Sequence, residues 1–245
     1  MLGVIPARWG STRFPGKPLH PIAGKPLIQH VWERCRACRK LDAVAVATDD
    51  ERIARAVRAF GGEVVMTRSD HESGTDRIAE VARKRASFTH IVNIQGDEPL
   101  ISPKLIDRLA DRLVKSADCP MITAANEMAA DDPDFDNPNV VKVTIDRRGR
   151  ALYFSRSLIP YPRNPETAGL RHFRHKGIYG FRRDFLLQFV RWKPSMLERA
   201  EGLEQLRAME NGAEILVILT DDDSPGVDTP EQAAILHDRL LSQVK

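Results

Sequence analysis

The sequence has few cysteines, and none of them indicates a disulfide or redox site. Cys35, Cys38 and Cys119 are an odd number and accompany no export signal, which argues against a disulfide framework. A Cys-x-x-Cys pair can be redox-active at the start of a helix, but Cys35 and Cys38 fall late in an apparent helix. We therefore expect buried or near-surface thiols.

The sequence also lacks long apolar runs and a strong excess of charge. No apolar run approaches the roughly 20 residues that span a bilayer, and the first residues show no secretion-signal pattern. The 37 basic and 34 acidic residues leave a formal net charge of only +3. Proteins that bind nucleic acid or anionic membranes through bulk charge are more basic than this. We therefore expect a cytoplasmic protein with no nucleic-acid or membrane partner, whose anion sites are local.

Short apolar runs alternate with helical patterns through the first half of the chain. This alternation is typical of βαβ units that share a mostly parallel sheet. Because 42% of the 245 residues are hydrophobic, the chain can bury a sizeable core. We predict an α/β fold with a doubly wound, mostly parallel sheet and a single domain over residues 1–245. Strands are predicted at 2–5, 43–47, 63–66, 90–94 and about 121–125, with helices between them that include one to about Arg39 and one at 75–85.

The second half changes character at a predicted hairpin. Strands at 140–145 and 151–154 flank Asp146-Arg147-Arg148-Gly149, a turn sequence that favours a hairpin over a crossover. We therefore expect a small antiparallel excursion at about 140–182. Within it, residues 155–173 show little periodicity and are interpreted as an active-site loop.

Later segments predict two further strands and two helices. Apolar runs predict strands at 175–181 and 215–219, and one helix is predicted from about Ser195 to Gly212. Residues 229–232 read TPEQ, which is the capping-box pattern with proline at the first helical position. A last helix is therefore expected to begin there.

Basic residues and glycines follow the first predicted strand. Residues 6–19 read PARWGSTRFPGKPL and contain Arg8, Arg13 and Lys17. In a doubly wound sheet, ligands bind beyond the carboxyl ends of the strands. Glycines expose backbone N–H groups and the three cations could neutralise a triphosphate, although a basic surface loop has the same composition. Because the GxxxxGK[ST] and GxGxxG patterns are absent, we predict a nucleotide cradle of another type.

Two aspartates follow strongly apolar strands and could hold a divalent cation. Asp97 lies in Gln95-Gly96-Asp97-Glu98-Pro99, and Asp228 lies just before the predicted last helix. Mg²⁺ prefers one or two carboxylates together with phosphate oxygens. A helix cap is the alternative for each, but Thr229 already fills that role and leaves Asp228 available. The sequence predicts a shared site without showing that the two aspartates meet.

Other charged groups are less specific. The acids at 221–223 are interpreted as a solvated turn, because a run of like charges is usually exposed. His172 and His175 lack an evident third metal ligand, and Arg171, Arg174 and Lys176 beside them would repel a cation. An anionic substrate suits this cluster better than a metal.

Nine segments, in order along nearly the whole chain, together resemble the 3-deoxy-manno-octulosonate cytidylyltransferase family, also called CMP-Kdo synthetases. They are IPARWGSTRFPGKPL, ATDD, GGEVVMT, SGTDR, NIQGDEP, ALYFSRSLIP, HKGIYGF, LEQLR and GVDTPE. The first and fifth indicate a broader cytidylyltransferase group, whereas ALYFSR, HKGIYGF and LEQLR are more particular. Trp9 and Phe14 stand where Tyr and Leu are frequent, which could change how the loop closes over CTP.

The resemblance implies a nucleotidyltransferase-like fold, a homodimer with the excursion at its interface, and Mg²⁺ as cofactor. It implies transfer of CMP from CTP to the anomeric hydroxyl of 3-deoxy-manno-octulosonate (Kdo), with release of pyrophosphate, for lipopolysaccharide biosynthesis. The implied catalytic residues are Lys17, Arg13 and Asp97, and the implied metal ligands are Asp97 and Asp228. The implied nucleotide-binding residues are Pro6, Ala7, Arg8, Arg13, Lys17, Ser73, Gly74, Thr75 and Arg77. The implied sugar-acid-binding residues are Gln95, Arg156, His175, Tyr179, Glu204 and Gln205, of which Glu204 and Gln205 would otherwise be interpreted as surface.

Two alternatives remain open from the sequence. The same chemistry could act on another acid, such as an 8-amino analogue of Kdo or sialic acid. A noncatalytic nucleotide or nucleic-acid binding module could also use the basic loops; it would bind with a steep salt dependence and release no pyrophosphate. The two acidic loops count against that second alternative.

Overall fold

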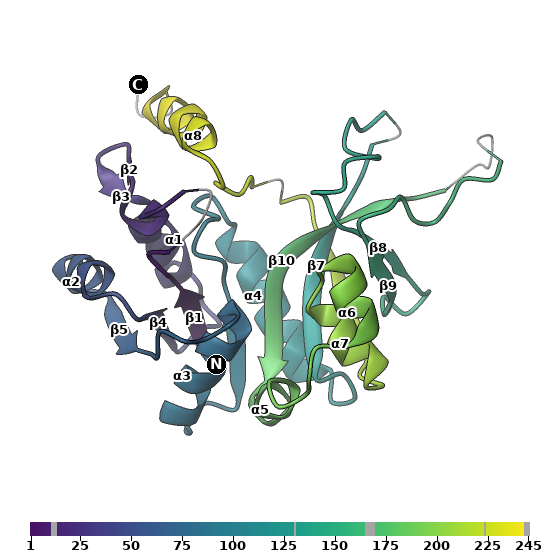
Figure 1. Ribbon diagram of the computed structural model, residues 1–245, viewed down its shortest axis with the longest axis horizontal. Helices are drawn as coiled ribbons and strands as arrows, with labels where there is room; N and C mark the ends of the chain where they lie inside the picture. Colours follow the sequence, from purple (N-terminus) through teal and green to yellow (C-terminus); the bar gives the residue numbers. More distant parts are fainter. Residues whose placement is uncertain (11–13, 130, 165–169, 223, 243–245) are drawn as a thin grey trace.

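Nine strands form one sheet in the computed structural model, which describes residues 1–10, 14–129, 131–164, 170–222 and 224–242 (Figure 1). The strand order is β11-β7-β10-β6-β1-β4-β5, with β8 paired to β10 and β9 paired to β8. Strands β1, β4, β5 and β6 are parallel to one another, whereas β10 is antiparallel to both of its main neighbours. The predicted α/β fold with a mostly parallel sheet is therefore confirmed.

The elements have the following bounds. The strands of the main sheet are β1 Leu2–Pro6, β4 Ala43–Thr48, β5 Glu63–Met66, β6 His90–Asn93, β7 Met121–Glu127, β8 Lys142–Ile145, β9 Ala151–Ser155, β10 Phe173–Arg182 and β11 Ile215–Leu219. A separate pair is formed by β2 Pro21–Ile22 and β3 Lys25–Pro26. The helices are η1 Lys17–Leu19, α1 Leu27–Arg36, α2 Glu51–Ala59, α3 Gly74–Lys84, α4 Pro103–Lys115, α5 Arg183–Phe189, α6 Met196–Glu201, α7 Gln205–Glu210 and α8 Pro230–Ser242.

Helices cover both faces of the sheet, as a doubly wound fold requires. Successive residues of a strand point to opposite faces, so Val4 packs in one apolar core and Ile5 in the other. The core on one face includes side chains of α1, α2 and α4, and the core on the other includes side chains of α3, α5 and α7. Strands buried on both faces have near-continuous apolar sequences, which explains why they were predictable.

The second-half hairpin is confirmed. Strands β8 and β9 pair antiparallel, with Val143 opposite Phe154. Figure 1 shows this hairpin at the end of the molecule away from β5. The described parts of the β7–β8 and β9–β10 connections project beside it as two arms.

Some predicted elements needed correction. The single helix expected over 195–212 is two helices, because Gly202 adopts a left-handed conformation with φ of 63° and ends α6. Helix α1 ends at Arg36, before the predicted Arg39. Helix α5 and the β2–β3 pair were not predicted, since both are too short to show a clear periodicity.

Two expectations from the sequence concern membrane-spanning helices and the burial of the cysteines. None of the helices in the described residues combines the length and the apolar character needed to cross a bilayer. Cys35 and Cys119 are buried and Cys38 is partly buried, and all three are free thiols. Burial raises the pKa of Cys35 well above its ordinary value and that of Cys38 to about 12. The prediction of buried or near-surface thiols is therefore confirmed.

Candidate active site

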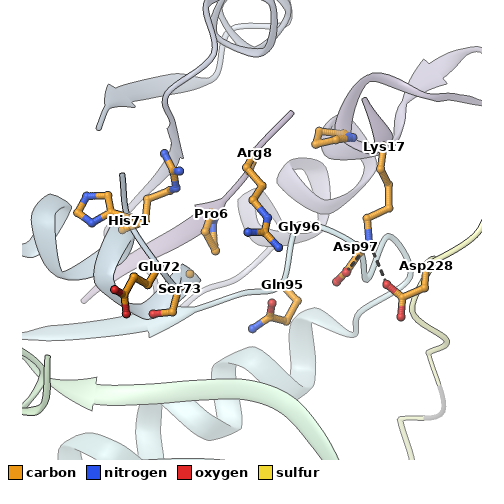
Figure 2. Close-up of a pocket in the computed structure, with 14 residues that line it drawn as sticks. Pro6, Arg8, Lys17, His71, Glu72, Ser73, Gln95, Gly96, Asp97 and Asp228 are labelled. Carbon is orange, nitrogen blue, oxygen red and sulfur yellow. Dashed lines mark hydrogen bonds and ion pairs between the residues drawn. The ribbon is translucent and has the colours of Figure 1, made fainter. Parts of the chain in front are cut away.

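A cavity of about 270 Å³ opens at the carboxyl ends of β1 and β6 (Figure 2). This is the edge of the sheet at which doubly wound folds bind ligands. The cavity brings together residues from four separate segments of the chain. Its walls are Pro6, Ala7, Arg8, Lys17, Pro18, His71, Glu72, Ser73, Gly74, Arg77, Gln95, Gly96, Asp97 and Asp228.

Lys17 joins the two predicted metal ligands. Its ammonium Nζ lies 2.7 Å from Asp97 Oδ2 and 3.1 Å from Asp228 Oδ1. Asp97 and Asp228 therefore converge on one cation at the N-terminal loop, as Figure 2 shows. Arg8 is exposed, and its guanidinium points into the same cavity. Arg13 lies outside the described residues.

Backbone contacts hold the two acidic loops against each other. The amide of Val227 donates to the carbonyl of Asp97 at 2.8 Å. The side chain of Gln232 accepts from the amides of Asp228 and Thr229, and Thr229 Oγ1 accepts from the Gln232 amide, so the predicted capping box forms. Thr229 and Gln232 cap the helix, and the Asp228 carboxylate faces Lys17.

Glycines let the loops approach closely. A Cβ on Gly96 would lie 2.8 Å from the carbonyl oxygen of Pro6, so only glycine lets the 95–97 loop pack on the end of β1. Gly16 has a φ of 72° and turns the chain into η1, where Lys17 is the first residue. The predicted glycine-rich loop therefore sets the direction of Lys17.

The donor set fits a magnesium ion better than a metal that needs a full protein cage. Within the described ranges, no group of three or more His, Cys, Asp or Glu side chains could hold a metal. Two carboxylates that already share one cation match the preference of Mg²⁺, which keeps waters and substrate phosphates as its other ligands. Asp97 and Asp228 are therefore the residues that would hold it.

The start of α3 forms a second wall of the cavity. Ser73 caps this helix through a capping box with Asp76, and Ser73, Gly74 and Arg77 at the start of the helix line the cavity. Arg77 is buried, and its Nη1 lies 2.6 Å from Thr67 Oγ1 and 3.0 Å from Asp49 Oδ1. Arg77 thus lines the cavity while an acid and a hydroxyl fix its guanidinium.

A β-bulge in β10 lies beside the cavity. The pairing of β10 with β7 shifts between Lys176 and Tyr179. Gln95 donates to the carbonyl of Gly177 at 3.0 Å, and Thr123 donates to the carbonyls of Lys176 and Ile178. Bulges often redirect side chains next to active sites. Here the bulge connects the Gln95 loop to the strand that carries His175 and Tyr179.

The side chains of His175 and Tyr179 contact each other on β10, and both are uncharged at neutral pH. Their rings lie 5.4 Å apart, and His175 Nε2 is 2.9 Å from Thr123 Oγ1. Burial lowers the pKa of His175 to about 3. Burial, together with the Glu204 carboxylate, raises the pKa of Tyr179 well above its ordinary value. Both side chains are therefore hydrogen-bonding groups rather than ionic ones at neutral pH.

Glu204 connects the sugar-acid candidates to the start of α3. Its carboxylate accepts from Ser73 Oγ at 3.0 Å and from Thr75 Oγ1 at 2.5 Å. Gln205 is buried, and its amide nitrogen has no hydrogen-bond partner among the described residues. The surface interpretation that the helical pattern suggested for these two residues is wrong for Gln205, because α7 is buried along most of its length.

Arg156 lies away from the cavity walls. Its Nε donates to the carbonyl of Glu201 at 2.6 Å and its Nη1 to the carbonyl of Pro138 at 2.8 Å. Arg156, His175, Tyr179, Glu204 and Gln205 are absent from the cavity lining, and of the sugar-acid candidates Gln95 alone is part of it. The structure thus brings the two metal candidates together with most of the nucleotide candidates. Thr75 is the exception among the described nucleotide candidates, because it is not part of the cavity lining and donates to Glu204 instead.

The basic cluster around His172 does not converge on one anion. Arg171 pairs with Glu127, and Arg174 pairs with Asp132 and Asp134. His172 contacts the carbonyl of Pro160 at 3.0 Å. Because neighbouring residues of a strand alternate between faces, a run of cations in sequence is divided between separate partners.

Sequence reasoning missed a buried ionic group formed by Lys176 and the segment that leads to Asp228. Lys176 Nζ donates to the carbonyls of Asp222 and Ser224 at 3.0 and 3.2 Å. The Asp222 side chain is 8% exposed and accepts from the amides of Ser102 and Ser224, so the solvated-turn interpretation was wrong for this residue. Burial raises the pKa of the nearby Glu98 to about 7, against the opposing charge of Lys176.

Comparison with known proteins shows the family. Residues 2–215 match the sequence profile described as cytidylyltransferase. The chain is 50% identical over 246 aligned positions to a 3-deoxy-manno-octulosonate cytidylyltransferase from Geobacter sulfurreducens, covering 97% of this chain and 98% of that one. It is 53% identical to the protein of the same name from Syntrophotalea carbinolica, covering 93% of each.

Solved structures agree. A CMP:2-keto-3-deoxy-manno-octonic acid synthetase complexed with CTP superposes with a TM-score of 0.94 at 45% identity, covering 99% of this chain and 98% of that one. A 4-diphosphocytidyl-2C-methyl-D-erythritol synthase from Anaerococcus prevotii, 11% identical over 98% of this chain and 96% of that one, has a TM-score of 0.63 and shares the fold. The chain belongs to the 3-deoxy-manno-octulosonate cytidylyltransferase family.

Proposed function

We propose that this protein transfers CMP from CTP to the anomeric hydroxyl of 3-deoxy-manno-octulosonate and releases pyrophosphate, as a step in making lipopolysaccharide precursors. The convergence of Asp97 and Asp228 on Lys17, at the mouth of a cavity lined by Arg8 and the start of α3, supports this function. A triphosphate needs cations and helix N–H groups, and its metal needs carboxylates; one cavity offers both.

The reaction is an in-line displacement at the α-phosphorus of CTP. The oxygen of the sugar's anomeric hydroxyl forms a bond to the α-phosphorus and gives its proton to water. The bond between the α-phosphorus and the oxygen that bridges it to the β-phosphorus breaks, and pyrophosphate leaves. Charge develops on phosphate oxygens, so placement of cations dominates the catalysis. Lys17 and Arg8 face the cavity and are suited to neutralise those oxygens. Arg13 is proposed to assist them from the same loop.

A divalent ion fits the two aspartates. Mg²⁺ held by Asp97 and Asp228 would supply further neutralisation of the phosphate charge. Asp97 also lies one residue from Gly96, which touches the end of β1, so this loop is set by the sheet rather than by flexible chain.

The sugar-acid candidates supply hydrogen bonds more than charge. At neutral pH, His175 and Tyr179 are uncharged, so the carboxylate of the sugar acid needs Arg156 or a cation of the cradle as its counter-ion. The amide of Gln205 has an unused donor and suits a sugar hydroxyl. We therefore propose that Gln95, His175, Tyr179, Glu204 and Gln205 recognise hydroxyls and that Arg156 recognises the carboxylate.

Pyrophosphate release tests the function. The assay combines the protein with CTP, Mg²⁺ and a panel of acids: Kdo, its 8-amino analogue and sialic acid. We expect release with Kdo above the other acids. Preferential release with sialic acid or the 8-amino analogue would reassign the substrate, and CTP binding without release with any acid would favour the noncatalytic binding module.

The resemblance to the family also implies a homodimer in the cytoplasm. We propose that the β8–β9 hairpin and the two arms beside it form the dimer surface. Leu152 on β9 is 60% exposed and Tyr161 on the adjoining arm is 81% exposed. Exposed apolar side chains on projecting elements are typical of contact surfaces.

A further inference from the structure

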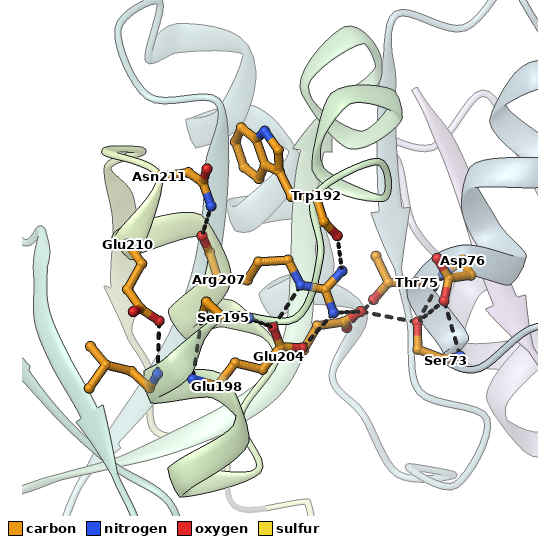
Figure 3. Close-up of polar contacts among 11 residues, drawn as sticks. Ser73, Thr75, Asp76, Trp192, Ser195, Glu198, Glu204, Arg207, Glu210 and Asn211 are labelled. Atoms are coloured by element: carbon orange, nitrogen blue, oxygen red, sulfur yellow. Dashed lines mark hydrogen bonds and ion pairs between the residues drawn. The ribbon is translucent and has the colours of Figure 1, made fainter.

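Glu204 lies where the two halves of the proposed site meet. It precedes α7, and its two carboxylate oxygens accept from Ser73 and Thr75 at the start of α3, 131 and 129 positions away in sequence (Figure 3). Ser73 also lines the nucleotide cavity. The orientation of the Glu204 carboxylate therefore affects how the proposed sugar-acid residues contact the helix start that lines the nucleotide cavity.

Among the described residues, Arg207, three positions further along, is the cation that forms an ion pair with Glu204. Its Nη2 lies 3.9 Å from Glu204 Oε1, the same oxygen that accepts from Ser73. Arg207 is only 8% exposed. Burying a guanidinium lowers the stability of the fold unless an acid pairs with it, so Arg207 needs a buried partner.

Glu198 fixes the guanidinium of Arg207. Arg207 Nε donates to Glu198 Oε2 at 2.7 Å, and Nη2 pairs with the other carboxylate oxygen, which makes a bidentate contact (Figure 3). Nη1 donates to the carbonyl of Trp192 at 3.4 Å, and the guanidinium lies 5.0 Å from the centre of the Phe189 ring. Contacts with Phe189 of α5, Trp192 beyond its end and Glu198 of α6 therefore leave Arg207 with one orientation.

The charge of Arg207 also acts on Glu204. Burial raises the pKa of Glu204, and Asp76 nearby raises it further, while the donors Thr75 and Ser73 and the Arg207 charge lower it. Tyr179 also faces Glu204 and is neutral. Among these groups Arg207 is the cation that favours the carboxylate form.

We propose that Arg207, clamped by Glu198, is a positioning residue that holds the Glu204 carboxylate ready for the sugar acid. This rests on the proposed function, since Glu204 is assigned to the sugar acid there. Arg207 itself touches neither substrate; it acts through Glu204.

A structural role is the alternative, because breaking any buried ion pair lowers stability. Two variants separate the roles. Arg207→Met leaves the buried Glu198 carboxylate without its cation. Arg207→Met with Glu198→Gln removes both charges and keeps a side-chain oxygen that accepts from the amide of Ser195. The double variant is therefore expected to recover melting temperature without recovering the charge beside Glu204.

The test measures melting temperature and the KM for each substrate in the pyrophosphate assay. We expect the KM for the sugar acid to rise by about tenfold in both variants, the cost of about one charge-assisted contact. The KM for CTP should stay near the wild-type value. Loss of the cation raises the pKa of Glu204, so the KM defect should be larger at about pH 6 than at about pH 8.

The outcomes are distinguishable. A double variant whose sugar-acid KM returns to wild type along with its melting temperature would show a purely structural pair and overturn the inference. An unchanged sugar-acid KM in Arg207→Met, with an active wild-type protein, would overturn it as well. A wild-type protein that turns over no sugar acid would instead overturn the proposed function, and this inference with it.

Discussion

The His175 side chain shows how burial decides what one residue contributes. The ring packs between Phe154 and Tyr179, with centroids 5.0 and 5.4 Å away, and contacts Thr123. Its pKa of about 3, compared with 6.5 for an unperturbed histidine, means that the folded protein holds the neutral form. The unfolded chain regains the ordinary pKa and binds a proton below it. His175 therefore contributes stability above pH 6.5 that is lost progressively as pH falls towards 3.

This predicts a measurable stability difference for His175→Gln, a neutral replacement that keeps polar atoms. Between about pH 7.5 and about pH 5.5, the wild-type free energy of unfolding should fall by about 1.4 kcal/mol more than that of the variant. Urea unfolding at the two pH values measures both. Equal losses in the two proteins would show that folding leaves the pKa of His175 at its ordinary value, and would contradict this prediction.

At the residue scale, the sequence predicted which residues belong to the site better than it predicted which residues contact each other. Asp97 and Asp228 were identifiable because each follows a buried strand, whereas their meeting at Lys17 depends on strand order, which no single residue encodes. Asp222 was misinterpreted, because its neighbours in sequence resemble a solvated turn while its actual partners are amides up to 120 positions away. Arg207 gave no signal beyond its place in LEQLR.

At the element scale, the segment between β11 and α8 depends on one buried lysine. Lys176 comes from the β10 bulge and donates to two carbonyls of this segment, which ends at Asp228. Asn126 on β7 donates to the carbonyls of Thr220 and Asp222. These hydrogen bonds fix the first residues of the segment against β7. We infer that Lys176 sets the place from which Asp228 reaches the metal site.

Lys176→Met should therefore weaken metal binding as well as stability. Two carbonyls lose a charged donor, which costs about 1–3 kcal/mol of unfolding free energy. Lys142→Met is the matched control, since Lys142 is also buried and donates to two carbonyls, of Asn137 and Arg156, outside the metal loops. With CTP present, Mn²⁺ titration followed by electron paramagnetic resonance should show weaker binding in Lys176→Met only. Equal Mn²⁺ affinity in the two variants would contradict this role.

The sequence predicted long elements well and short ones poorly. Strands such as β11 have continuous apolar sequences that leave little doubt about their type. The sequence predicted one helix in place of α6 and α7, because the apolar positions continue across Gly202. The left-handed conformation of Gly202 ends α6 at that point. The bulge in β10 has no sequence signal apart from Gly177.

At the scale of the whole molecule, the hairpin and its arms project from the sheet (Figure 1). If they form the proposed dimer surface, a charge at Tyr161 should separate the subunits, because an aspartate buried at an interface is costly. We expect a dimer mass for the wild type by light scattering and a monomer mass for Tyr161→Asp. Met196→Asp is the control, because Met196 is 66% exposed on α6, outside the excursion, and should stay dimeric. A monomeric wild type would contradict the proposed dimer.

The central claim is that Asp97 and Asp228 hold one divalent cation beside the N-terminal loop. Mn²⁺ affinity in the presence of CTP, measured for the wild type, Asp97→Asn and Asp228→Asn, tests it most directly. Each single variant should stay folded and bind Mn²⁺ at least about tenfold more weakly, since even outer-shell partners of a metal contribute that much. Wild-type Mn²⁺ affinity in either variant would show that its aspartate is not a ligand, and would contradict the account.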